Sequence, residues 1–421
     1  MRPGDKTWRE HAADEIARPT RAASLIRLAL LAERRVAAAR SGTGNSYLEY
    51  QALKASLVAF EPGAVVPWVS YMFPPELLNA YGLTPFIPEV AASVVAGSEL
   101  GPRLDAAMNR LPLARDVCSY HRAALAALDD GLLPPPTLCL GTTSLCMGKE
   151  RLLDSLSRRF GVPFLELRVP EPPDEGPADA YDVADLSEQL RDLHETVGRL
   201  TGRRSDLRRA IIRSNRATAA WRKLAEQRAA GTVQLDGRRT FALTFIAQIV
   251  WGTEAGAKGF EKLLTEKGQR DLLPPAGLNG NTKRLLWLHV FPRDDDGTYR
   301  LMSDHDTFVA FEEVGQVRLD PLDPDDPFPG LARRMIEHPL WGSAARRARE
   351  VLDLARATKV DGVVHYNHLG SRPALGSVPT IRQTLVDAGL PFIAFDGDAL
   401  ARAGNSEGQG RSEFESFLEL L

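Results

Sequence analysis

Short apolar runs typical of buried strands alternate along the chain with longer segments whose apolar residues recur at helical spacing. The predicted strands are residues 64–72, 83–87, 137–141, 163–169, 284–291, 308–313, 362–367 and 392–396. The predicted helices between and around them are residues 74–82, from about 90 to 118, 119–129, 149–160, 331–338, 343–358, 380–388 and 411–420. Strands that alternate with helices through short loops form parallel sheets. We therefore predict an α/β protein with two Rossmann- or flavodoxin-like parallel-sheet domains.

Two further stretches show only the helical pattern. Residues 1–54 repeat apolar positions at helical spacing, and residues 178–283 contain a predicted hairpin at 183–230 and a helix at about 240–267. A proline-rich linker at 170–177 precedes the second stretch. These boundaries give an N-terminal helical segment (1–54), a first α/β domain with Cys118 and Cys146 (55–177), a helical insert (178–283) and a second α/β domain (284–421).

The composition narrows the class of protein. The chain has 421 residues, 44% of them hydrophobic and 25% charged, and a net charge of −3, so a generic nucleic-acid binder is not expected. Its most apolar run, residues 241–251, is far shorter than the ~20 residues of a membrane span, and no secretory leader is visible. With an odd number of cysteines and no disulfide framework, we expect a cytoplasmic protein without membrane or nucleic-acid partners.

All three cysteines, Cys118, Cys139 and Cys146, lie in one stretch that ends near Lys149. Few thiols gathered in one place either fill a core or take part in chemistry. Thiolates are the ligands that zinc and iron–sulfur clusters prefer, but the spacing matches neither a zinc knuckle nor a ferredoxin run. Residues 141–149 have the wrong glycine spacing for a phosphate loop, so ATP binding here is rejected. The residues alone leave the choice between core and cluster open.

Several segments together resemble a known family. They are SYMFPPELLNAYGLTPF (70–86), CSYHRAALAALDDG (118–131), TLCLGTTSLCMGK (137–149), GVPFLELRVP (161–170), HPLWGSAARRAREVLDLARATKVDGVVHYNH (338–368), AGLPFIAFDGD (388–398) and GQGRSEFESFLELL (408–421). In this order they resemble subunits of the 2-hydroxyacyl-CoA dehydratase and benzoyl-CoA reductase family, such as the D-component of 2-hydroxyglutaryl-CoA dehydratase. The resemblance covers roughly residues 55–421.

The resemblance implies a [4Fe-4S] cluster held by three cysteines in the cleft between the α/β domains. Cys118 and Cys146 match two of these metal ligands, whereas Cys139 matches none and is expected in the core. At the third position this chain has Ser371, or Gly370 with a one-residue shift, and no cysteine. A serine oxygen or His368 could replace it, a partner or substrate could supply the ligand, or the cluster could be lost.

Other candidate residues have both a functional and a structural interpretation. Glu76 corresponds to a family glutamate near the active site and could handle a proton, or it could simply favour the dipole of its helix. His365 and His368 follow a strand and could line the cleft, with His365 as a catalytic candidate, or they could be ordinary polar residues. The matched arginines, Arg346 and Arg347, are expected to pack or form ion pairs.

The implied activity is that of a lyase or an oxidoreductase on a CoA thioester, using one-electron chemistry through a ketyl radical. Its implied partners are a homologous subunit, in a heterodimer, and an ATP-dependent activator protein that donates the electron to the acyl-CoA complex. The alternatives are a cluster-poor structural or regulatory subunit, and a scaffold turned to another reduction or to binding without redox.

Overall fold

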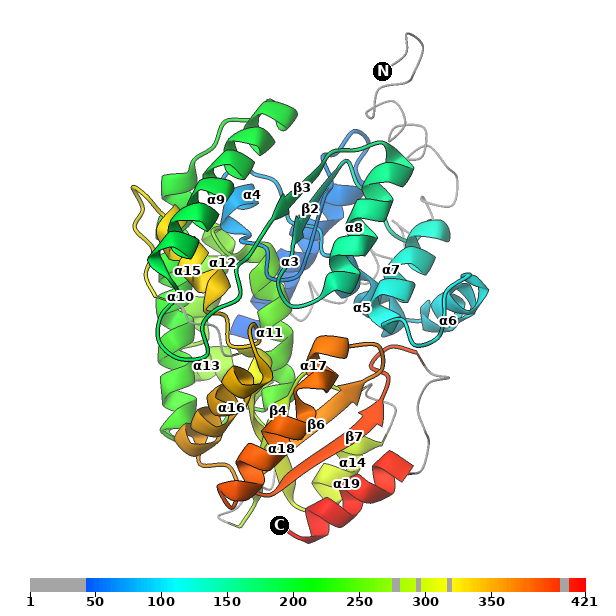
Figure 1. Cartoon of the computed structure of the whole chain (residues 1–421), viewed down its shortest axis with the longest axis vertical. Helices are drawn as coiled ribbons and strands as arrows, with labels where there is room; N and C mark the ends of the chain where they lie inside the picture. The colour runs from blue at the N-terminus through cyan, green and yellow to red at the C-terminus, as the bar shows by residue number, and fades with distance from the viewer. Residues whose placement is uncertain (1–42, 275–280, 293–296, 316–319, 402–408) are drawn as a thin grey trace.

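The computed structural model describes residues 43–274, 281–292, 297–315, 320–401 and 409–421 (Figure 1). The predicted N-terminal helical segment lies largely outside the described residues, and only its end is seen, in α3 (Gly44–Leu57). Within the described part of the chain, no helix combines the length and the apolar character that crossing a bilayer requires.

Three parallel strands form the first sheet, in the order β1-β2-β3. They are β1 (Pro67–Val69), β2 (Leu138–Thr142) and β3 (Phe164–Leu167). Successive β2 side chains point to opposite faces, so Cys139 packs with the apolar residues of one face while Leu138 and Leu140 pack with those of the other. The first face is covered by α5 (Pro88–Ala96), α6 (Gly101–Arg110), α7 (Ser119–Asp129) and α8 (Met147–Phe160), and the second by α4 (Glu76–Asn79), α9 (Ala180–Thr201) and α15 (Phe328–Ile336).

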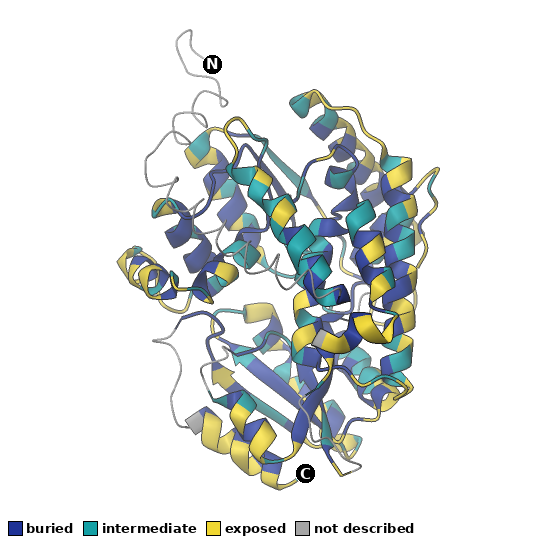
Figure 2. Cartoon of the chain, turned by 180° about the vertical axis from the view of Figure 1, so that it is seen from behind, coloured by how far each residue is buried: buried dark blue, intermediate teal, exposed yellow. Residues whose placement is uncertain are grey.

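The second sheet has four parallel strands in the order β5-β4-β6-β7. They are β4 (Lys283–Leu288), β5 (Thr307–Glu312), β6 (Gly362–His368) and β7 (Phe392–Gly397), and they are largely buried, as the dark strands in Figure 2 show. One face packs against α14 (Thr298–Asp304) and α19 (Gln409–Glu419), the other against α16 (Ala344–Thr358) and α18 (Val378–Asp387). The prediction of two parallel α/β units is confirmed.

A helical region lies beside both sheets (Figure 1). The predicted hairpin consists of α9 and α10 (Leu207–Ala229), and it turns at Gly202, whose φ of +67° favours glycine. The helices that follow are α11 (Gly237–Val250), α12 (Glu254–Lys262) and α13 (Glu266–Gln269), and short 3-10 turns are η1 (Val58–Phe60), η2 (Arg270–Leu272) and η3 (Glu313–Gly315).

Several predicted elements were wrong in extent. Residues 83–87 are not a strand: Phe86 makes one isolated bridge to Trp68, and the prolines at 85 and 88 lack the N–H that a longer ladder needs. The helix expected from about 90 to 118 is broken into α5 and α6, which ends before Pro112. The helix expected at 240–267 is likewise divided, at Gly252 with φ of +83°. The sequence pattern missed α14 and the short α17 (Arg372–Gly376).

The start of α7 is fixed against the end of β7, in the second sheet. Ser119 Oγ donates a hydrogen bond of 2.5 Å to Asp398 Oδ1, just beyond β7. Leu400 and Ala401 extend from there into the apolar core of the first sheet. Cys118, the N-cap residue of α7, therefore lies where the two α/β units meet.

Candidate functional site

A cavity of about 680 Å³ opens where the two α/β units meet. Its wall contains residues of α5 and α7, the turn before α8, helix α11, the segment after β4 and the loop after β6. In parallel sheets, ligands bind beyond the carboxyl ends of the strands, and the residues after β2, β4 and β6 occupy such positions. Of the predicted site residues, the structure brings Cys118, Cys146 and Ser371 to this wall.

Cys118 is held beside a histidine of the second α/β unit. Its Sγ lies 3.3 Å from Nε2 of His368, the last residue of β6. Nδ1 of His368 accepts the backbone N–H of Ala399 at 3.1 Å, so the proton of the neutral ring is on Nε2 and points to the sulfur. His368 is therefore a donor to Cys118 and not a base for it. This arrangement excludes a thiol nucleophile activated by His368.

The electrostatic surroundings of Cys118 keep it as a thiol while no cation binds it. Its pKa is raised to about 12, mainly by burial; the backbone N–H groups of Tyr120 and His121 oppose this shift, and nearby Cys146 and Asp398 add to it. A metal ion would reverse this preference, because coordination deprotonates a thiol. The third cysteine, Cys139, is fully buried in the core of the first sheet, away from the cavity.

Cys146 lies at the N-terminus of α8, in the turn that follows β2. The residue before it, Leu145, has a φ of +69°, a conformation that β-carbon sterics disfavour. His289, which follows β4, has a φ of +67° and lines the same cavity. Strained backbone at two points of one cavity wall is typical of a functional site.

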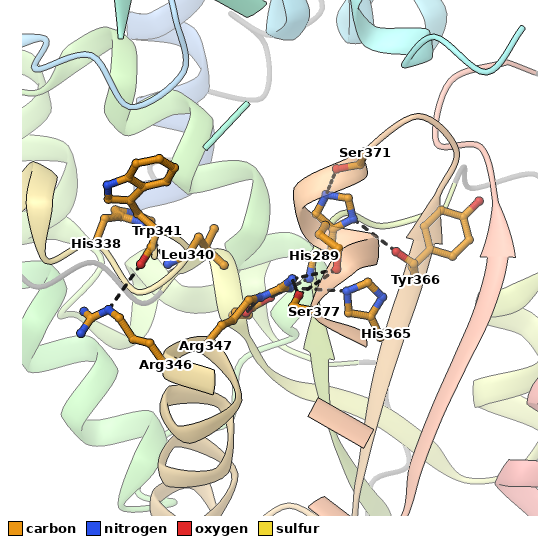
Figure 3. A network of polar contacts seen from close by, with 12 residues as sticks. His289, His338, Leu340, Trp341, Arg346, Arg347, His365, Tyr366, Ser371 and Ser377 are labelled. Carbon is orange, nitrogen blue, oxygen red and sulfur yellow. Dashed lines mark hydrogen bonds and ion pairs between the residues drawn. The ribbon is translucent and has the colours of Figure 1, made fainter. Parts of the chain in front are cut away.

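Ser371, at the position of the expected third ligand, hydrogen-bonds to His289. The distance from Ser371 Oγ to His289 Nε2 is 3.1 Å, and His289 Nδ1 lies 3.3 Å from the carbonyl oxygen of Tyr366 (Figure 3). Since a carbonyl only accepts, Nδ1 of His289 carries the proton and Nε2 accepts from the Ser371 hydroxyl. Burial lowers the pKa of His289 well below its usual value, with His365, His368 and Arg347 adding to the effect. The ring is therefore neutral.

His365 lies behind the cavity wall and belongs to a buried polar network. Arg347 binds Glu313 through two contacts of 2.7 and 2.8 Å and donates to Ser377 Oγ at 2.6 Å. One guanidinium nitrogen also lies 3.4 Å from His365 Nε2, as Figure 3 shows. His365 Nδ1 lies 2.8 Å from Asn367 Oδ1. Arg347 therefore forms the ion pair expected for this position, and His365 is fully engaged in structural contacts.

Glu76 lies on the wall of a separate, smaller cavity of about 70 Å³. Its Oε1 accepts from Ser214 Oγ at 2.6 Å and from Arg334 Nη1 at 3.1 Å. The side chain is in the first turn of α4, is 1% exposed and forms a partly buried ion pair. These contacts favour a structural interpretation, and they do not bring Glu76 to the cavity of the cysteines.

Sequence reasoning missed several polar residues of the large cavity, among them Glu89, His121, Lys149 and His289. His289 could have been found, because a polar residue directly after a buried parallel strand marks the ligand-binding edge of a sheet. Glu89, in the first turn of α5, gives the same local signal as any carboxylate that favours a helix dipole. Its role depends on the neighbours that the fold supplies.

Two side chains on this wall, those of Cys118 and Cys146, are of the kind that binds an iron–sulfur cluster. At the third expected ligand position, Ser371 has an oxygen in place of a sulfur. Cys118 and Cys146 supply thiols, and Ser371 supplies a hydroxyl oxygen that is hydrogen-bonded to His289. Among the described residues, no group of three or more His, Cys, Asp or Glu side chains is arranged to hold a metal ion. A cluster here would therefore need the serine oxygen or a ligand from outside the chain.

Two parallel α/β units with a cavity between them, and two thiols on its wall, define the chain as a two-unit α/β protein. The comparison with known families is specific: the chain belongs to the family of the 2-hydroxyglutaryl-CoA dehydratase D-component, which matches residues 70–421. The (R)-phenyllactyl-CoA dehydratase alpha subunit of Clostridium sporogenes is 20% identical over 380 residues, which cover 87% of this chain and 92% of that protein. The resemblance predicted from the sequence is thereby confirmed, and the chain is a dehydratase-like enzyme subunit.

Proposed function

We propose that this chain is a subunit of a 2-hydroxyacyl-CoA dehydratase-type lyase, which takes a CoA thioester into the cavity between its α/β units. The observation that carries the proposal is the meeting of Cys118, Cys146 and Ser371 on one cavity wall. These residues come from separate stretches of the chain and from both α/β units. Family membership and the dehydratase subunit among its relatives support the reaction class.

Cys118, Cys146 and Ser371 would hold a [4Fe-4S] cluster, which when bound supplies single electrons to the thioester. The role of this chain's own residues is to hold the donors and to keep the site dry. His368 donates its Nε2–H toward the Cys118 sulfur, and hydrogen bonds to cluster sulfurs tune reduction potentials. Phe241, Phe245 and Phe291 place aromatic surface on the cavity wall and limit the access of water.

The implied assembly is a heterodimer with a homologous subunit, served by an ATP-dependent activator protein that delivers the electron. The relative in Clostridium sporogenes is named as an alpha subunit, which supports a multi-subunit enzyme. We infer that phenyllactyl-CoA and other 2-hydroxyacyl-CoA thioesters are suitable first substrates to test. Dehydration is favoured over ring reduction because the named relative is a dehydratase.

A second candidate function is a cluster-poor subunit that supports a partner. It is favoured by one observation: the third ligand position is a serine whose hydroxyl is already hydrogen-bonded to His289. In this case the partner would carry the complete set of cysteines, and the cavity of this chain would bind substrate or stabilise the complex.

The two candidates differ in iron content. Protein purified without oxygen should contain about four iron and four sulfide per chain if the cluster is present. Cys118→Ala, Cys146→Ala and Ser371→Ala should each lower that content, whereas Cys139→Ala should not, because Cys139 is buried away from the cavity. Folded chain that stays free of iron after reconstitution, yet binds a 2-hydroxyacyl-CoA, would favour the cluster-poor subunit.

A further inference from the structure

Three ionisable side chains that are not among the proposed cluster ligands meet on the cavity wall, each from a different helix. Glu89 is in the first turn of α5, His121 is on α7 and Lys149 is on α8. Gly148 permits this approach, because a β-carbon there would lie 2.7 Å from the His121 ring and 3.4 Å from the Cys146 sulfur. The group therefore lies beside one of the two cavity thiols.

The carboxyl of Glu89 has no full set of partners. Its Oε1 lies 3.7 Å from His121 Nε2, and its Oε2 is buried without a hydrogen-bond partner in the described part of the structure. The side chain is 13% exposed, so little water reaches it from outside the cavity. A buried carboxylate oxygen without a donor is unfavourable, and the neutral acid avoids that cost.

The neighbours of Glu89 do not reverse its preference for the neutral, protonated form. Burial raises the pKa of Glu89 to about 7, although its own backbone N–H and the charge of Lys149 lower it. Burial lowers the pKa of His121 to about 4, with Lys149 and His368 adding to the effect, so His121 is neutral and forms no ion pair. The ionisable groups that act on Glu89 and His121 are therefore the ammonium of Lys149 and the neutral imidazole of His368, besides the contact between Glu89 and His121 themselves.

Lys149 is held in place and is not the acid of this group. Its Nζ donates to the carbonyl oxygen of Tyr71 at 3.1 Å and to Thr142 Oγ1 at 3.0 Å. Burial lowers its pKa to about 8, with Cys146, Glu89 and Glu150 opposing the shift. The ammonium therefore remains mostly charged near neutral pH, which suits it to stabilise the anion that Glu89 becomes on giving up a proton.

We propose that Glu89 is the proton donor to the hydroxyl group that leaves a 2-hydroxyacyl thioester bound in this cavity. The inference rests on the proposed function and assigns a residue to the acid role. After the thioester has received one electron, as the proposed function requires, the carbon–oxygen bond breaks with its electron pair on oxygen, the carboxyl O–H bond breaks, and a new O–H bond completes water. The substrate then loses a proton from carbon 3 and gives the electron back, so the balance is the loss of one water, and one proton returned to Glu89 restores the acid.

The test uses the full chain with its partner subunit and electron donor, and CoA thioesters of lactate, 2-hydroxybutyrate and phenyllactate as probes. Glu89→Gln keeps the shape and removes the acid, and it should lower the dehydration rate by a factor of about 10² or more. Probe affinity should change by less than about threefold, since the donor acts on the leaving group and not on the thioester. Glu99→Gln, an exposed carboxylate after the same helix, should match the wild type.

Two further readouts separate an acid role from a structural one. The wild-type rate should fall as the pH rises through about 7, because the donor is protonated only below its pKa, and Glu89→Asp should keep part of the rate together with this pH limb. Infrared difference spectra of wild type against Glu89→Gln should show a protonated carboxyl band at pH 6 that disappears at alkaline pH.

The outcomes that overturn the inference are distinct from one another. A folded Glu89→Gln enzyme with the wild-type rate and pH profile overturns the role of Glu89 and leaves the proposed function standing. Absence of the protonated carboxyl band does the same. A wild-type complex that neither binds nor dehydrates any of the three thioesters overturns the proposed function and the inference together.

Discussion

Arg347 shows how one buried cation organises its surroundings. It is 7% exposed and binds Glu313, Ser377 Oγ and the carbonyl oxygen of Ala374. Arg347 lowers the pKa of Glu313 against the burial that raises it, and burial together with Arg347 lowers the pKa of His365 to about 3. The network therefore keeps one carboxylate charged and one imidazole neutral behind the cavity wall.

At the residue scale we predict that Arg347→Met lowers the free energy of unfolding by about 3–5 kcal/mol, because Glu313 would be left buried without its partner. Arg356→Met, an exposed arginine on the same helix α16, should cost less than about 1 kcal/mol. Urea unfolding followed by circular dichroism compares the two. Equal effects of the two variants would contradict a structural role for the Arg347–Glu313 pair.

At the scale of elements, the loop between β6 and α17 sets where Cys118 lies. Gly370 has a φ of +83°, and a β-carbon on it would lie 2.3 Å from the backbone nitrogen of Cys118 and 2.7 Å from the carbonyl oxygen of Asp116. Both contacts are to backbone, which cannot turn away as a side chain could. The close approach of two chain segments from different α/β units therefore requires glycine here.

Gly370→Ala should destabilise the protein by at least about 2 kcal/mol, from the disfavoured backbone conformation and the overlap with Cys118. Gly376→Ala is the matched control, because a β-carbon there meets nothing within 4 Å and the residue ends α17. It should be neutral or stabilise by up to about 1 kcal/mol. Thermal and urea unfolding measure both, and a harmless Gly370→Ala would show that the two segments can separate.

The whole molecule buries several imidazoles in the neutral form. Burial lowers the pKa of His121, His194, His338 and His368 to about 4, and His289 and His365 are also shifted down. The unfolded chain takes up these protons near pH 6.5, whereas the folded chain does not until about pH 4. Stability contributed by each group is therefore present above about pH 6.5 and is lost as the pH falls toward 4.

We predict that the urea midpoint at pH 5 lies well below that at pH 7.5. Each buried histidine contributes a slope of up to about 1.4 kcal/mol per pH unit. Glu89, with its pKa raised to about 7, opposes this trend between about pH 4.5 and 7, but the shifted histidines outnumber it. His194→Gln should make the pH dependence shallower. A midpoint that is constant from pH 7.5 to 5 would contradict the burial of neutral imidazoles.

The sequence by itself determined the two parallel α/β units and the family. Alternating side-chain direction along a buried strand and repeated apolar positions along a helix are local properties, so β2, α7 and the α9–α10 hairpin were predictable from their residues. Cys118 and Cys146 were found because the motifs around them are local as well. Residues 83–87 were misread because apolar content alone does not show whether a neighbouring strand is available to pair.

Only the tertiary structure decided how the candidate residues are grouped. It brought Cys118 beside His368 and Ser371 beside His289. It placed Glu76 on the wall of another, smaller cavity. The chemistry of Glu89 depends on burial and on partners that arrive from distant helices, and neither is encoded in its own neighbourhood in the chain. Local sequence patterns predict helices and strands because these elements depend on interactions between residues that are near one another in the chain. A functional site depends on contacts between residues that are far apart in the chain, and only the fold brings those together.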